Sequence, residues 1–149
     1  NKTGSVINYQ PGKALPTTDI VSLPVDMLVT AAVPDLITGS NVQRVQAKYV
    51  IEGSNIPMSV VMEEVLFKKK IIVVPDFVAN AGGVISSYAE YKGKNPEAMF
   101  KLVEKKIIKN TNLVLEQAKK NGTKLRDAAM QIAVERVLKK CKTCRKPKE

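Results

Sequence analysis

Residues 71–84 read IIVVPDFVANAGGV. The segment begins with an apolar run, which ends at Pro75, and continues with small and amide side chains. The run is almost continuously apolar rather than alternating, which is typical of a strand in a parallel sheet covered on both faces. Two earlier segments of the chain have the same character. We therefore predict three buried strands, which span residues 26–30, 48–52 and 71–74.

Helical patterns separate the predicted strands. Thr38 can cap a short helix through Val45, and Pro57 stands at the first position of a helix that continues to Lys70. A strand–helix–strand–helix–strand order predicts right-handed crossovers and a parallel sheet. Neither a GxGxxG nor a GxxxxGKS/T motif occurs. We therefore expect this chain to hold only the half of a dinucleotide-binding sheet that does not carry the glycine loop.

A helical extension follows the third strand. Helices are predicted over residues 81–91, 96–121 and 125–137, and Asn95 and Gly122 bound the second of them. The predicted fold class is α/β, half of a doubly wound, Rossmann-like parallel sheet of about three strands with C-terminal helices. We expect a single domain over residues 1–149, with a loop-rich lead-in (1–25), C-terminal helices (95–140) and a basic tail (141–149).

The composition is that of a soluble globular protein, with 44% hydrophobic and 26% charged residues. No apolar run approaches membrane-spanning length and no signal-peptide pattern opens the chain, so we expect a cytoplasmic protein with no membrane partner. The net charge is +10, but the lysines are spread through helical stretches and aromatic residues make up only 5%. A solvated basic surface accounts for this charge, and nucleic-acid binding is not expected.

Cys141 and Cys144 form one CxxC in the basic tail. A structural zinc site needs four ligands, and the chain has no His and no further Cys. We therefore expect no metal site, and we interpret the two cysteines as reduced thiols in a solvated tail.

Small and amide side chains follow each predicted strand. In an open parallel sheet, ligands bind at the carboxyl ends of the strands. An Asn before small residues at a helix start exposes N–H groups, and its side chain can both donate and accept hydrogen bonds. Each such segment alone is ordinary turn chemistry. Three at successive strand ends predict a binding site, formed by residues 31–35, 52–57 and 75–84.

These segments resemble a known family. Residues 75–90, PDFVANAGGVISSYAE, are similar to the PDFLANAGGVxxSYFEW segment of glutamate dehydrogenases. Residues 23–32, LPVDMLVTAA, resemble that family's LxVDILxPAA strand, and EGSN with Pro57 resembles its EGANGP loop. Residues 125–129, LRDAA, match a late helix of the family. The resemblance extends over residues 3–140.

The resemblance implies a cofactor site and a substrate site. NAD or NADP would bind with its nicotinamide-side ribose along Ala31 and Ala32. Asn55 would contact that ribose or the nicotinamide, and Asn80 the nicotinamide amide or the polar end of the substrate. The side chain of L-glutamate would contact the hydroxyl of Ser87 and the apolar side chain of Val84. These two residues are three apart in the sequence and therefore lie on one face of a helix.

The resemblance also implies an enzyme larger than this chain. Glutamate dehydrogenases deaminate L-glutamate to 2-oxoglutarate and ammonia, and their catalytic Lys and Asp lie upstream in another domain. We therefore expect no catalytic residue in this chain, no turnover by the isolated chain, an upstream catalytic domain as its partner, and a homo-oligomer, which is a hexamer in the family.

Departures from the family pattern leave alternatives open. Asp35 stands where the family usually has Asn, and Ile56 replaces a Gly beside Asn55, where a bulky side chain can crowd the cofactor. A branched-chain amino-acid dehydrogenase shares the NAGGV segment, although Ser87 favours glutamate over an apolar substrate. A degenerate, non-catalytic half-domain is the other alternative. Finally, the apolar edge of the first strand is expected to be covered, by residues 5–9 as an added strand or by a second chain.

Overall fold

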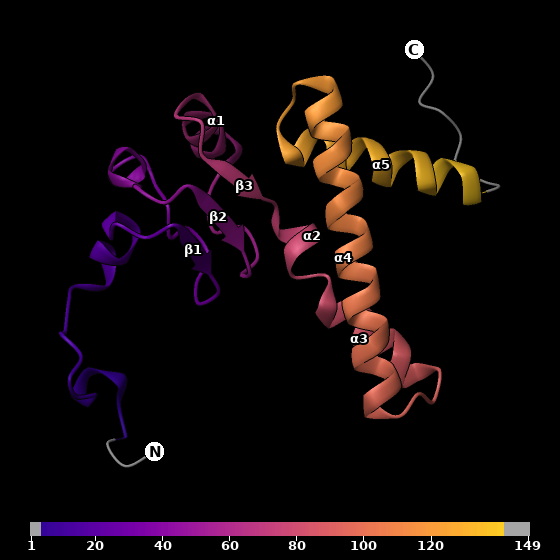
Figure 1. The fold of residues 1–149 in the computed structure, drawn as a ribbon, viewed down its shortest axis with the longest axis horizontal. Helices are drawn as coiled ribbons and strands as arrows, with labels where there is room; N and C mark the ends of the chain where they lie inside the picture. Colours follow the sequence, from indigo (N-terminus) through magenta and orange to yellow (C-terminus); the bar gives the residue numbers. More distant parts are fainter. Residues whose placement is uncertain (1–3, 142–149) are drawn as a thin grey trace.

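The computed structural model describes residues 4–141. Its centre is a three-stranded parallel sheet of β1 (Met27–Thr30), β2 (Tyr49–Glu52) and β3 (Ile72–Val74), in the order β1-β2-β3 (Figure 1). Each strand lies within one residue of its predicted span. The prediction of half an open parallel sheet is therefore confirmed.

The connections between the strands differ from the prediction. The helix expected over residues 38–45 is only a 3-10 turn, η3 (Val42–Arg44). The cause is the Asn41 side chain, which accepts a hydrogen bond from the Thr38 N–H (2.8 Å) and donates one to the Leu36 carbonyl (2.9 Å). Because this amide takes up the backbone groups of the loop, an α-helix does not form there.

The helix between β2 and β3 begins later than predicted. This helix, α1 (Val60–Lys68), is capped by Ser59, whose hydroxyl accepts from the Met62 N–H. Pro57 is not a first helical position. The Pro57 carbonyl accepts a hydrogen bond from the Ile37 N–H (2.9 Å), and Met58 forms a parallel β-bridge with Ile37. The segment before α1 is therefore extended and paired with the segment that follows β1.

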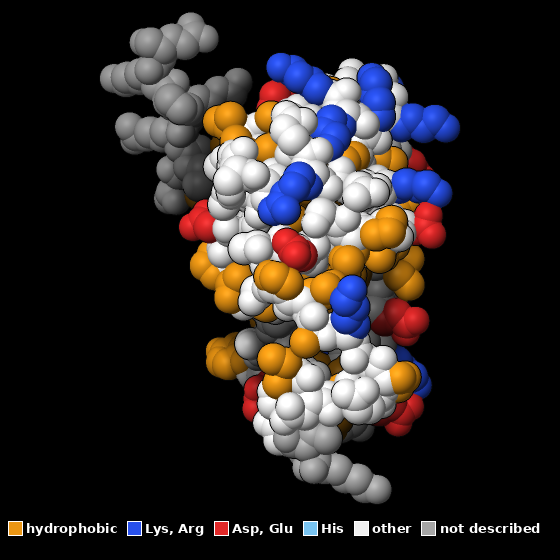
Figure 2. Space-filling model, turned by 90° about the vertical axis from the view of Figure 1, so that its left-hand side faces the viewer, with side chains coloured by type: hydrophobic (Ala, Val, Ile, Leu, Met, Phe, Trp, Pro, Cys, Tyr) orange, Lys and Arg blue, Asp and Glu red, His pale blue; other side chains and the backbone are white. Residues whose placement is uncertain are grey.

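The N-terminal residues do not cover the edge of the sheet. They contain two 3-10 helices, η1 (Val6–Asn8) and η2 (Thr17–Ser22), and within the described residues β1 pairs with β2 alone. The side chains of Met27 and Val29 are 54% and 55% exposed. The prediction of an added strand from residues 5–9 is therefore wrong. Figure 2 looks onto this side of the molecule, where apolar side chains lie among lysines and arginines.

Four helices follow β3. They are α2 (Asp76–Ala79), α3 (Gly82–Tyr91), α4 (Pro96–Asn121) and α5 (Leu125–Lys140). Asn95 caps α4 by accepting from the Ala98 N–H at 2.9 Å, and Gly122 ends it with a left-handed φ of 65°, as predicted. In Figure 1, α4 runs beside α2 and α3, and the turn after α4 brings the start of α5 close to β3, from where α5 runs away from the sheet.

Two apolar clusters stabilise this arrangement. One fills the space between the sheet, η3 and α1 and includes Leu28, Val50 and Leu66. The other joins α2 to the C-terminal helices and includes Val78, Val114 and Ala128. The second cluster therefore fixes the helical extension against the segment that begins at the end of β3.

Two further findings concern the membrane and the tail. Within residues 4–141 no helix is long and apolar enough to cross a bilayer.

Cys141 is disulfide-bonded, so the expectation of a reduced thiol there is wrong. Cys144 and the rest of the predicted basic tail lie outside the described residues.

Candidate functional site

The carboxyl ends of β2 and β3 bring two predicted cofactor residues into contact. Asn55 follows β2, and Asn80 follows the short helix α2 after β3. The Asn80 side chain donates a hydrogen bond from Nδ2 to Oδ1 of Asn55 at 2.7 Å. Asn55 is exposed and Asn80 is half-buried. The two amides therefore form one polar pair at the edge where parallel sheets bind ligands.

The loop after β2 packs closely on the loop after β1. A Cβ atom on Gly53 would lie 3.2 Å from the Cβ of Ala31, so this approach favours glycine at position 53. The Ser54 N–H donates to the Thr30 carbonyl at 2.6 Å. The predicted residues Ala31 and Ala32 are exposed beside this junction. The structure thus places both alanines in the loop next to the one that carries Asn55.

Two departures from the family pattern occupy unusual backbone conformations. Ile56 has φ 48° and Asp35 has φ 50°, in the left-handed region that suits Gly and Asn, the residues of the family pattern at these positions. Hydrogen bonds hold both residues there. The Asp35 N–H donates to the Ile56 carbonyl (3.0 Å), and the Ile56 N–H donates to Asp76 Oδ2 (3.1 Å). The isoleucine therefore adopts a glycine-like conformation at an energetic cost.

The predicted substrate residues, Val84 and Ser87, lie on α3, the helix that begins two residues after Asn80. Val84 is 77% exposed, and Ser87 is also exposed, so both side chains are accessible to a small molecule. The Ser87 hydroxyl donates to the Gly83 carbonyl at 3.1 Å. In the described part of the chain no hydrogen bond joins Val84 or Ser87 to the Asn55–Asn80 pair. The structure therefore places these two residues near the pair in sequence but does not join them to it.

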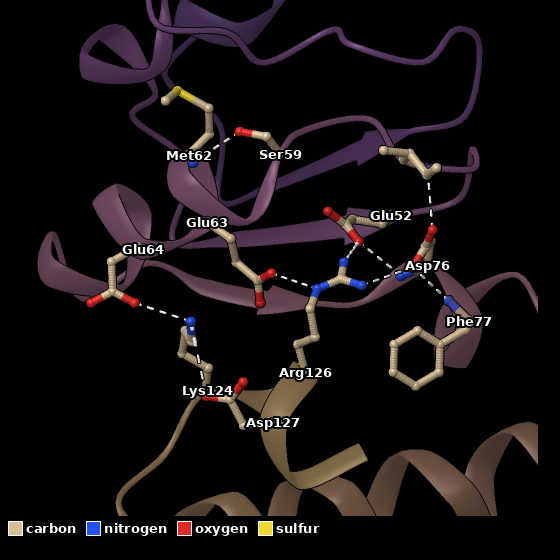
Figure 3. Close-up of polar contacts among 11 residues, drawn as sticks. Glu52, Ser59, Met62, Glu63, Glu64, Asp76, Phe77, Lys124, Arg126 and Asp127 are labelled. Carbon is tan, nitrogen blue, oxygen red and sulfur yellow. Dashed lines mark hydrogen bonds and ion pairs between the residues drawn. The ribbon is translucent and has the colours of Figure 1, made fainter. Parts of the chain in front are cut away.

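The structure also contains an ionic cluster that we did not predict from the sequence (Figure 3). Arg126, in the first turn of α5, uses three nitrogens on three carboxylates. Nε donates to Glu63 Oε2 at 2.5 Å, Nη2 to Glu52 Oε2 at 2.6 Å and Nη1 to Asp76 Oδ1 at 3.2 Å. One guanidinium thus ties α5 to α1, to the end of β2 and to the start of α2.

Two of these carboxylates are almost wholly buried. The side chain of Glu52 is 0% exposed and that of Glu63 is 2% exposed. Burial raises the pKa of Glu52 to about 7, although the Asp76 N–H and Arg126 oppose it. In both residues Oε1 has no hydrogen-bond partner within the described residues. Arg126 is therefore the cation that offsets two buried carboxylates.

Asp76 connects this ionic cluster to the amide pair. Partial burial acts to raise the pKa of Asp76, but the N–H groups of Ile56 and Phe77 and the Arg126 guanidinium outweigh it and hold the pKa below its usual value. The Asp76 N–H donates to Glu52 Oε2 at 2.8 Å. Its carboxylate therefore accepts from both the Asn55 loop and α5.

The sequence held only a partial signal for this cluster. Glu52 ends a buried strand, where a charged residue needs a partner, and LRDAA belongs to the resemblance without a role for its arginine. Nothing in the spacing shows that positions 52, 63, 76 and 126 meet. Within residues 4–141, no group of three or more His, Cys, Asp or Glu side chains is arranged to hold a metal ion.

An open parallel sheet with a polar site at its carboxyl ends is the arrangement of Rossmann-type dehydrogenases. Residues 1–144 match the family described as Glutamate/Leucine/Phenylalanine/Valine dehydrogenase. The chain belongs to this family.

Similar proteins include three dehydrogenases. The chain is 43% identical to the glutamate dehydrogenase of Aeropyrum pernix, over 94% of its own length and 36% of that protein. It is 34% identical to the NADP-specific glutamate dehydrogenase of Saccharolobus shibatae, over 94% of its length and 35% of that protein. The Leu-bound hetero-hexameric glutamate dehydrogenase from Thermus thermophilus superposes with a TM-score of 0.77 at 28% identity, covering 91% of this chain and 33% of that chain. The chain thus spans about a third of the length of these relatives.

Proposed function

We propose that the chain is the C-terminal part of an NAD(P)-dependent glutamate dehydrogenase and supplies contacts to the nicotinamide and to the glutamate side chain. The observation that carries the proposal is the contact between Asn55 and Asn80 at the carboxyl ends of β2 and β3. The similarity to glutamate dehydrogenases over 94% of the chain supports it.

The amide pair has the hydrogen-bonding groups that a nicotinamide carboxamide requires. The contact uses Nδ2 of Asn80 and Oδ1 of Asn55. In the described part of the chain, Oδ1 of Asn80 and Nδ2 of Asn55 make no hydrogen bond, which leaves one acceptor and one donor on the pair. A carboxamide presents one N–H₂ and one C=O, so it can pair with both. Ala31 and Ala32, with small side chains beside Asn55, would leave room for the adjoining ribose.

The substrate pocket is proposed on α3. Ser87 would donate its hydroxyl hydrogen to the distal carboxylate of L-glutamate, and Val84 would pack on the methylene groups. The Ser87 hydroxyl now donates to the Gly83 carbonyl and is exposed, so it can turn toward a ligand. A hydrogen bond to a charged carboxylate is stronger than one to a carbonyl, and this favours the exchange.

The whole enzyme would oxidise L-glutamate to 2-oxoglutarate with release of ammonia. The nicotinamide supplies the hydride acceptor when it is bound, and the residues of this chain orient it and the substrate. The catalytic residues would come from an upstream domain, none of them from this chain. We further propose a cytoplasmic homo-oligomer, as the family resemblance implies. A solved relative that is described as hetero-hexameric supports the oligomer, although its subunits are not all identical.

The test is an exchange of segments. This chain would replace the segment that it matches in the Aeropyrum pernix enzyme. Steady-state kinetics would then compare Asn80→Ala with Asn112→Ala, an exposed asparagine on α4. Loss of one hydrogen bond predicts a KM for the nicotinamide cofactor that rises roughly three- to tenfold in Asn80→Ala only. Unchanged cofactor KM in Asn80→Ala would disprove the cofactor assignment.

A branched-chain amino-acid dehydrogenase is the second candidate. The family description includes leucine and valine dehydrogenases, and the exposed Val84 is an apolar contact that such substrates would use. The two candidates differ at Ser87, because a hydroxyl in the pocket suits a carboxylate and not a branched alkyl group. Comparing L-glutamate with L-leucine as substrates of the exchanged enzyme distinguishes them.

A further inference from the structure

The Asn55–Asn80 pair depends on a single aspartate. The Ile56 N–H, next to Asn55, donates to Asp76 Oδ2 at 3.1 Å. The Asn80 N–H donates to the Asp76 carbonyl at 2.8 Å. Asp76 therefore binds the residue after Asn55 through its side chain and Asn80 itself through its backbone carbonyl.

The position of Asp76 depends in turn on Arg126. Asp76 shares this guanidinium with two other carboxylates, that of Glu52, which also accepts from the Asp76 N–H, and that of Glu63 on the other side of the guanidinium (Figure 3). Arg126 offsets this charge and donates to Asp76 Oδ1. The Phe77 ring, 5.6 Å from the Arg126 guanidinium carbon, also contacts the arginine.

Removal of the guanidinium would act most strongly on the aspartate. Glu52 and Glu63 are held in the interior at 0% and 2% side-chain exposure, whereas Asp76 is 14% exposed. Of the three like charges, the one nearest to solvent is the one that can turn toward water. That movement would release the Ile56 N–H and, with it, the Ile56 backbone, which has a left-handed φ of 48°.

We propose that Arg126 is a positioning residue for the Asn55–Asn80 pair, acting through Asp76, so that the C-terminal helix α5 sets the geometry of the cofactor-facing amides. The inference rests on the proposed function for its catalytic meaning, but its structural part is independent of any ligand. Arg126 touches neither asparagine. It acts on them from α5, fifty residues further along the chain than Asp76.

The chain offers a matched control for this role. Lys124 lies two residues before Arg126 and also ties α5 to α1, through an ion pair with Glu64 at 3.0 Å. It does not contact Asp76 or Glu52. Lys124→Met and Arg126→Met therefore both weaken the junction between α5 and α1, but only Arg126→Met removes the link to the amide pair.

Nitrogen-15 NMR of the 149-residue chain measures the structural part directly. The Asn80 side-chain amide signals should move, and their exchange with water should accelerate roughly tenfold, in Arg126→Met. The same change is expected in Asp76→Ala, which leaves Arg126 paired with both glutamates, and not in Lys124→Met. The signals of Asn41, whose amide lies in a separate loop, should stay constant in all three variants. Asn80 signals that do not move in folded Arg126→Met or Asp76→Ala would overturn the inference.

Kinetics in the exchanged enzyme separate this inference from the proposed function. Arg126→Lys keeps the charge but loses the three-nitrogen geometry. It should raise the KM for the cofactor by about the same factor as Asn80→Ala, with a smaller change in kcat. If the Asn80 signals move but cofactor KM is unchanged in both Arg126→Lys and Asn80→Ala, the positioning role stands and the cofactor role of the pair fails.

Discussion

Replacing Glu52 with glutamine should remove most of the pH dependence of stability that this residue causes. Glu52→Gln keeps an oxygen that can accept from Arg126 and the Asp76 N–H, and it puts an uncharged N–H₂ where Oε1 has no partner in the described residues. Burial raises the pKa of Glu52 to about 7 in the folded chain. From the usual value near 4.5, this rise corresponds to about 3 kcal/mol.

The sign follows from which state holds the proton more tightly. The folded state holds the proton of Glu52 more tightly than the unfolded state. The contribution of Glu52 to the free energy of unfolding is therefore fully present below pH 4.5 and is lost as the pH rises to about 7. The pKa of Asp76 is lowered instead, so its contribution is lost only at more acidic pH. Between pH 4.5 and 7.5, the wild-type chain should therefore lose about 3 kcal/mol relative to Glu52→Gln.

Urea unfolding followed by circular dichroism at several pH values measures this difference. Glu104→Gln, at an exposed position of α4, is the matched control and should give a curve parallel to wild type. The reasoning is refuted if the wild-type and Glu52→Gln curves also run parallel between pH 4.5 and 7.5.

Three further predictions concern the loops, the substrate and the isolated chain. Ile56→Gly should raise the free energy of unfolding by about 0.5–1 kcal/mol, because relief of the left-handed strain exceeds the entropy that glycine costs. Lys106→Gly, at an exposed position inside α4, should lower it by about 0.5–1 kcal/mol, and a loss at both positions would contradict the strain argument. Ser87→Val in the exchanged enzyme should reduce kcat/KM for L-glutamate roughly ten- to a hundredfold, and no reduction would exclude Ser87 from the pocket. The isolated chain should bind NADH and NADPH no tighter than about millimolar by calorimetry, since the pyrophosphate contacts are missing; micromolar binding would reveal a phosphate site elsewhere.

The regular elements of the fold were predictable from the sequence because local rules determine them. The three apolar runs became β1, β2 and β3, and Asn95 and Gly122 bound α4 as their residue types predict. Two of the errors arose where a side chain bonds to nearby backbone. Asn41 replaced a helix with a 3-10 turn, and Ser59 took over the cap expected near Pro57. Such competition depends on the loop conformation, which the sequence pattern alone does not specify.

The candidate site was predictable only in part. Asn55 and Asn80 were each named from turn chemistry and resemblance, and the structure adds their contact. The ionic cluster was missed because its members, up to 74 residues apart, meet only after the sheet and α5 have packed. The left-handed conformation of Ile56 was likewise hidden, since an isoleucine gives no sign of it.

We propose that this chain carries the glutamate-binding and nicotinamide-facing part of a glutamate dehydrogenase. The most direct test is the ratio of kcat/KM for L-glutamate to that for L-leucine in the Aeropyrum pernix enzyme whose matching segment this chain replaces. We expect NAD- or NADP-dependent oxidation with a ratio well above one. A folded enzyme that prefers L-leucine, or that oxidises neither amino acid, would contradict it.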